Sequence, residues 1–143
     1  MEEGPLLVSD RTFGLYGLRH GHSYAHLRGF PDNYDDEGAV DRHTTVELVF
    51  SLVWRVSCGL NFTPLNLRYA NTAERQALQR RIGPIPPLKK VYLLEPDSME
   101  SYVIASELVI AEFAIGGGAD CPLTTEDPAY SALHPPVKPV VKF

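Results

Sequence analysis

Residues 44–70 read TTVELVFSLVWRVSCGLNFTPLNLRYA, and this stretch decides the expected fold. Its first part is nearly all apolar and ends at Gly59. Between Val46 and Val56, polar side chains recur only at every fourth position, at Glu47, Ser51 and Arg55. Such a run is typical of a helix that is covered on most of its circumference. Thr44 followed by Glu47 fits a capping box, and glycine is a usual helix stop, so we expect a central core helix over residues 44–59.

Shorter patterns predict the elements around this helix. Alternating apolar residues about a polar turn predict a β-hairpin over residues 12–30, with Phe13 and Leu15 on one face and Tyr16 and Leu18 on the other. The remaining segments are predicted as a strand over 65–69, a helix over 73–82, strands over 91–94 and 102–104, and a helix over 107–113. The sum is an α+β fold in the order hairpin–helix–strand–helix–strand, similar to a split βαβ unit.

The length of 143 residues suits a single domain with a sizeable core. We expect the α+β domain to occupy residues 1–115. Residues 116–143 begin with three glycines and end in HPPVKPVVKF, which predicts a connector and an extended or disordered tail.

Composition narrows the classes of partner. The formal net charge of -5 argues against direct nucleic-acid binding, because phosphate contacts need a basic surface. No apolar run reaches the length of a membrane span, and the N-terminus lacks the pattern of a signal peptide. Cys58 and Cys121 form no CxxC motif, so we interpret them as reduced thiols in a cytoplasmic protein.

Catalytic and metal motifs are missing from the sequence. There is no GxSxG elbow, no phosphate-binding loop and no HExxH pair. The hairpin carries His20, His22 and His26, but no cysteine or carboxylate motif accompanies them, so solvated turn histidines are the better interpretation. The acidic residues 32–41 lack the glycine and glutamate positions of a calcium loop. We therefore expect no enzyme activity, no cofactor and no metal.

Several segments resemble a known family, the effector-binding (arabinose-binding-like) domain of AraC-type transcriptional regulators. They are NFTPLNLRYANT at 61–72 after the apolar run, AERQALQRRIG at 73–83, SYVIASELV at 101–109 and CPLTTEDPAYSAL at 121–133. The resemblance covers roughly residues 12–133. Members of that family continue into a pair of helix-turn-helix units, whereas this sequence ends in a Pro-rich tail, so the resemblance implies a sensing domain without its DNA-binding part.

The resemblance implies a ligand-sensing or oligomerisation domain with a small-molecule effector, forming a homo-oligomer or joining a regulator partner. Aromatic walls and a few polar anchors are what a small-molecule site uses, which points to Tyr16, Tyr24, Trp54 and Arg55. The polar stripe that includes Glu47 and Arg55 lines a small polar pocket or lies at a solvent edge. Two alternatives stay open: a partner-binding protein without a ligand, and a small enzyme that uses the hairpin histidines.

Overall fold

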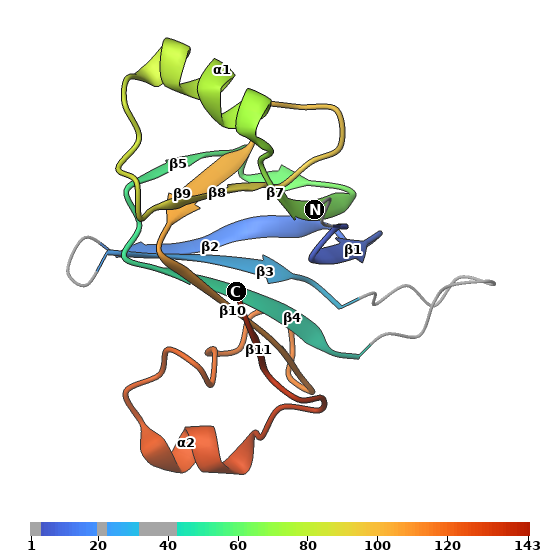
Figure 1. Cartoon of the computed structure of the whole chain (residues 1–143). Coiled ribbons are helices and arrows are strands. Elements are labelled where there is room, and N and C mark those ends of the chain that lie inside the picture. The colour runs from blue at the N-terminus through green and yellow to red at the C-terminus, as the bar shows by residue number, and fades with distance from the viewer. Residues whose placement is uncertain (1–3, 20–22, 32–42) are drawn as a thin grey trace.

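The computed structural model describes residues 4–19, 23–31 and 43–143. They form two antiparallel sheets that face each other, with one helix over each outer side (Figure 1). The five-stranded sheet has the order β1 (Leu7–Ser9), β7 (Leu65–Tyr69), β8 (Lys90–Leu93), β9 (Tyr102–Ala105), β5 (Arg55–Ser57). The six-stranded sheet has the order β11 (Val141–Lys142), β10 (Glu107–Phe113), β4 (Thr45–Ser51), β3 (Tyr24–Gly29), β2 (Phe13–Arg19), β6 (Asn61–Phe62). The helices are α1 (Thr72–Ile82) and α2 (Pro128–Leu133).

The predicted core helix over residues 44–59 is wrong, and with it the α+β fold class. The segment forms β4, a break at Leu52 with φ 53°, and β5, so the described chain is β-rich. A strand buried on both faces is as continuously apolar as a buried helix. Residues four apart also share a face in a strand, because its side-chain period is two. The frequent valines of this segment, which favour strands, were the signal against a helix.

The helix predicted over residues 107–113 is wrong for the same reason. ELVIAEF forms β10, which pairs with β4 along its whole length. The shorter strands are confirmed: β2 pairs with β3, and strands occupy 65–69, 90–93 and 102–105. The face predicted for Leu18 is wrong, because a bulge between Leu15 and Gly17 places Leu18 opposite Ala25, on the side of Leu15. Residues 20–22 of the hairpin turn and the whole acidic segment 32–41 lie outside the described residues.

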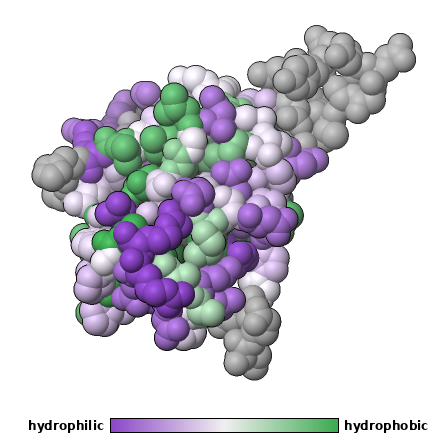
Figure 2. All heavy atoms as spheres, turned by 90° about the horizontal axis from the view of Figure 1, so that it is seen from above, coloured by the Kyte–Doolittle hydropathy of each residue, from purple (hydrophilic) through white to green (hydrophobic). Residues whose placement is uncertain are grey.

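The helix predicted after the strand at 65–69 is also confirmed, as α1. Asn71 caps it: its side chain accepts a hydrogen bond from the Glu74 amide at 2.8 Å, and the Glu74 carboxylate accepts one from the Asn71 amide at 2.9 Å. Gly83, at φ 97°, ends the helix. Leu78 of α1 is buried against Val91, Leu93 and Ile104 on the outer face of the five-stranded sheet. The side seen in Figure 2, from above α1, is largely hydrophilic with smaller hydrophobic areas.

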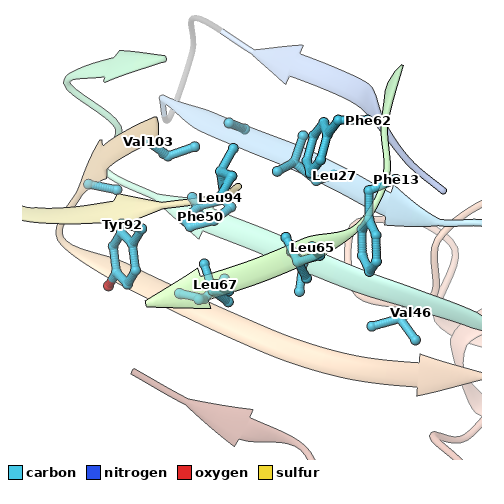
Figure 3. Packing of buried hydrophobic residues seen from close by; sticks show 14 residues of the cluster. Phe13, Leu27, Val46, Phe50, Phe62, Leu65, Leu67, Tyr92, Leu94 and Val103 are labelled. Carbon is cyan, nitrogen blue, oxygen red and sulfur yellow. The ribbon is translucent and has the colours of Figure 1, made fainter. Parts of the chain in front are cut away.

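The main core lies between the sheets (Figure 3). Ala25 and Leu27 of β3 and Leu48 and Phe50 of β4 face it from the six-stranded sheet, and Leu65, Leu67, Tyr92 and Val103 face it from the other. The alternation of side chains along β3 and β4 therefore turns His26, Arg28 and Glu47 to the opposite, outer face of the six-stranded sheet.

That outer face is covered by the chain after β10. Ala111, Phe113 and Ile115 pack there with Ala119, and the segment with α2 follows before β11 returns to pair with β10 (Figure 1). The expected domain boundary after residue 115 falls just beyond β10, and the extended tail ends with Phe143 exchanging backbone hydrogen bonds with Leu108. Among the described residues, no helix is long and apolar enough to cross a membrane.

Candidate functional site

Charged side chains lie fully buried on the outer face of the six-stranded sheet. His26 and Arg28 come from β3 and Glu47 from β4, where the backbone pairs Arg28 with Glu47. The exposed fractions of these side chains are 3% for His26 and 0% for both Arg28 and Glu47. Charged residues are almost never buried to this extent unless they are paired. The arrangement therefore depends on the contacts that these three side chains make with one another.

The Glu47 carboxylate is the centre of the cluster. It lies 2.5 Å from His26 Nε2 and 3.0 Å from Arg28 Nε, and it accepts a hydrogen bond from the Thr45 hydroxyl. Burial alone would raise the pKa of Glu47, but the hydrogen bonds from His26, Thr45 and Arg28 outweigh it and lower that pKa. Burial opposes charge on His26 in the same way, yet its contacts with Cys121 and Glu47 raise the pKa of His26 above 6.5.

Arg28 connects this cluster to the covering segment, which is residues 114–127 between β10 and α2. Its Nη1 donates to the backbone carbonyls of Gly117, at 2.9 Å, and Ala119, at 2.6 Å. The Tyr16 ring lies over the guanidinium, 4.0 Å from Cζ to the ring centre, and its hydroxyl donates to the Ala119 carbonyl at 3.3 Å. Residues some 90 positions apart in sequence are thus held together by one side chain. The remaining nitrogen, Nη2, is buried and has no hydrogen-bond partner among the described residues.

The covering segment brings Cys121 to the cluster. Its backbone carbonyl accepts hydrogen bonds from the amides of Thr124 and Thr125, at 3.1 and 3.0 Å, which closes a turn. The Tyr130 hydroxyl of α2 donates to the Asp120 carbonyl at 2.8 Å. One side-chain atom each of Cys121, His26 and Glu47 lies within 4.8 Å of the others. Cys121 is 4% exposed and forms no disulfide.

The three residues are of types that bind metals, but their spacing is that of a hydrogen bond. Zinc ligands lie about 2.0–2.2 Å from the ion, so a tetrahedral pair of nitrogen and oxygen ligands is separated by about 3.4 Å. The separation of 2.5 Å between His26 and Glu47 is too short for that and suits a shared proton. As placed, the cluster fits a hydrogen-bonded array better than a metal centre.

Cys121, His26 and Glu47 are called the array below. A pocket of about 400 Å³ opens beside the array, between the β2–β3 hairpin and the covering segment. Its lining residues are Tyr16, Gly17, Tyr24, His26, Asp120, Cys121, Thr124, Thr125 and Glu126. Glu126 also lies 3.9 Å from Arg19 of the hairpin, so an ion pair spans the two elements. The pocket combines two tyrosine rings, two threonine hydroxyls, two carboxylates, an imidazole and a thiol.

The structure separates the four residues predicted for a small-molecule site. Tyr16 and Tyr24 line this pocket. Trp54 and Arg55 lie elsewhere, at the start of β5, where the Trp54 amide donates to the Ile104 carbonyl and the Arg55 side chain is exposed. The polar stripe of residues 44–59 is divided too, because Glu47 is buried in the array.

Sequence reasoning missed Arg28 and the role of Cys121. The pattern YAHLRG of β3 held a signal for Arg28, since it places His26 and Arg28 on one face and Ala25 and Leu27 on the other. No local pattern marks Cys121, which reaches the array only through the fold of the covering segment. His20 and His22 lie outside the described residues.

Comparison of the chain with protein-family profiles, with curated protein sequences and with solved structures found no significant match. The resemblance to the AraC-type sensing domain therefore stays a prediction.

Proposed function

We propose that this protein is a small-molecule-binding domain of the sensing kind, and that its ligand occupies the pocket lined by Tyr16, Tyr24 and Cys121. The observation that carries the proposal is the pocket of about 400 Å³ between the hairpin and the covering segment. Ligand pockets are commonly concavities of about 300–1,000 Å³ with aromatic walls and a few placed polar groups. The proposal keeps the sensing role that the AraC resemblance implies.

The lining indicates the chemistry of the ligand. Tyr16 and Tyr24 offer ring faces for a flat apolar part, while Thr124 and Thr125 offer hydroxyls. Asp120 and Glu126 offer carboxylates, which accept hydrogen bonds and attract positive charge. A compact molecule with an unsaturated or aromatic portion and hydrogen-bond donors such as amines, amides or hydroxyls suits this set.

The proposed response follows from which elements form the pocket. The hairpin is one wall, and the covering segment, which leads through α2 to β11, is the other. A ligand changes a conformational equilibrium only by binding its states unequally. A molecule that contacts both walls favours the state in which Arg28 holds the covering segment against the sheet. We propose that this change is passed to a second copy or a regulator partner, in a cytoplasmic setting that keeps the two thiols reduced.

The test is thermal unfolding of the chain across a small-molecule library, with the molar mass recorded by light scattering. A ligand present at 100 times its Kd adds about 2.7 kcal/mol of stability. The proposal predicts a raised midpoint for compounds with the chemistry above. A library of such compounds that leaves the midpoint unchanged would overturn it.

One observation favours the alternative, a partner-binding protein. Leu18, Leu52 and Trp54 are 60%, 55% and 40% exposed. Leu18 and Val53 line a common depression near the end of the hairpin, and the Val53 amide donates to the Ser23 carbonyl at 2.8 Å. Exposed apolar side chains next to such a depression are a feature of many interfaces. A dimer mass that Trp54→Arg reduces to a monomer mass, with no ligand response, would favour this function.

A further inference from the structure

We propose that Cys121 is a nucleophile activated by His26 and Glu47, and that it captures small soft electrophiles covalently inside the pocket. The inference rests on the proposed function in one respect, since the same pocket must admit the molecule. It goes further by naming the ligand class: compounds with an activated carbon, such as an α,β-unsaturated carbonyl.

The order of the three side chains relative to the pocket carries the proposal. Cys121 and His26 both line the pocket, whereas Glu47 is not among the lining residues and lies behind His26. The His26–Glu47 contact of 2.5 Å fixes the imidazole, and Cys121 lies within 4.8 Å of both partners. A nucleophile, a base and an orienting carboxylate in this spatial order form the arrangement that activates a cysteine.

Groups behind the array hold it in place. Arg28 and Thr45 both contact the Glu47 carboxylate, so its charge is retained in a buried position. The turn at 121–125 and the Arg28 hydrogen bonds to residues 117 and 119 fix the backbone on either side of the thiol. A nucleophile on a positioned turn needs little reorganisation when it reacts.

Other ionisable groups face the thiol and modify its reactivity. Tyr16, Tyr24, Asp120 and Glu126 share the pocket with it, Arg28 lies behind His26, Arg19 lies near Glu126, and Tyr130 contacts residue 120. The cations and the imidazolium favour the thiolate, and the carboxylates oppose it. The pH profile of the reaction measures the balance between these two sets of groups.

Cys58 provides an internal control. It is half-buried and is not among the residues that line the pocket beside Cys121. Burial and the nearby Glu95 charge raise the pKa of Cys58. It should therefore behave as an ordinary, slowly reacting thiol.

The chemical step balances without a further reagent. The Cys121 thiol gives its proton to His26, and the sulfur electron pair forms a bond to the β-carbon of the unsaturated carbonyl. The electron pair of the C=C double bond moves to the α-carbon as an enolate, which then takes the proton back from His26. The product is a thioether, nothing is oxidised or reduced, and no group leaves.

The experiment is labelling of the full chain with N-ethylmaleimide, with adducts located by peptide mass spectrometry. The proposal predicts one fast adduct at Cys121, formed at least tenfold faster than the adduct at Cys58. In the Cys58→Ser background, His26→Gln should slow the reaction about tenfold or more, in line with the usual effect of a positioned base. Equal rates at the two cysteines would overturn the proposal.

A pH–rate profile of the unmutated chain covers the case in which His26→Gln does not fold. An activated thiol reaches its rate plateau well below the ordinary cysteine pKa of about 8.5, and an ordinary thiol does not. A Cys121 rate that rises tenfold per pH unit up to about 8.5 would overturn the proposal. So would full protection of Cys121 by one equivalent of Zn²⁺ alone, which would make the array a metal centre.

These outcomes are independent of the proposed function. Labelling is measured on the ligand-free chain, so slow Cys121 chemistry leaves any reversible ligand response intact. If no compound of the library binds, the labelling rates of Cys121 and Cys58 can still be compared.

Discussion

His26 Nε2 and Glu47 Oε1 lie 2.5 Å apart on adjacent strands, with both side chains removed from solvent. A buried imidazole next to a buried carboxylate is unfavourable unless the two share charge and further donors complete the carboxylate. Arg28 and Thr45 are those donors. The array is therefore a costly arrangement on the outer face of a sheet whose inner face already supplies the hydrophobic core. Its position beside the pocket indicates a role in the pocket rather than in stability.

The first prediction concerns the charge of Glu47. Glu47→Gln leaves Arg28 buried without its counter-charge, so it should lower the free energy of unfolding by about 3–5 kcal/mol in urea titration. The control is Glu100→Gln, which breaks the exposed contact with Arg81 and should cost about 0–1 kcal/mol. Equal small losses for the two variants would show that the buried pair contributes nothing particular.

The second prediction concerns pH. The raised pKa of His26 contributes stability that is complete below 6.5 and lost as pH rises through the folded-state value. The lowered pKa of Glu47 contributes stability that is complete above 4.5 and lost as pH falls through its folded-state value. The pair therefore stabilises most between pH 4.5 and 6.5. In urea midpoints measured from pH 3 to 9, His26→Gln should flatten the alkaline limb, and an unchanged limb would exclude His26 as its source.

The third prediction concerns the link between Arg28 and the covering segment. Hydrogen bonds from charged groups are worth about 1.5–3 kcal/mol each, which corresponds to tenfold or more in an opening equilibrium. Arg28→Met should therefore speed amide hydrogen exchange in residues 116–126 by about tenfold or more beyond the rest of the chain. Arg81→Met, on the opposite side, should leave that segment unchanged. Protection that persists in Arg28→Met would show that the segment is held by other contacts.

The sequence was informative where a pattern was local. The hairpin over 12–30, the strand over 65–69 and the helix over 73–82 each depend on residues close in the chain, and these elements are present. β4 and β10 were predicted as helices because each is covered on both sides. In β10, Leu108 belongs to the inter-sheet core, while Ala111 and Phe113 pack on the opposite face. Burial on both sides removes the alternation that identifies a strand.

The site was predictable only in part. Tyr16 and Tyr24 were named from their residue type, and they do line one pocket. Trp54 and Arg55 were grouped with them on the assumption of a helix, which fails once the chain turns at Leu52. Arg28 and Cys121 meet across a sequence separation of more than 90 residues, and only tertiary structure brings such positions together.

The fourth prediction concerns the packing of the hairpin. A Cβ added at Gly29 would lie 2.6 Å from the Phe13 ring, which is fully buried and cannot withdraw. Gly29→Ala should therefore destabilise the chain by about 1–3 kcal/mol in urea unfolding, as overpacked cores do. Gly116→Ala, where a Cβ meets nothing within 4 Å, should change stability by no more than about 0.5 kcal/mol. Similar values for both glycines would contradict the close approach at Gly29.

Calorimetric titration of a library hit tests whether the ligand occupies the pocket between the hairpin and the covering segment. Thr124 lines the pocket and Trp54 does not, although sequence alone favoured Trp54. The account predicts that Thr124→Phe, which fills the pocket, weakens binding at least tenfold, about 1.4 kcal/mol, while Trp54→Ala binds like the unmutated chain. Unchanged affinity in Thr124→Phe, or a loss confined to Trp54→Ala, would contradict it.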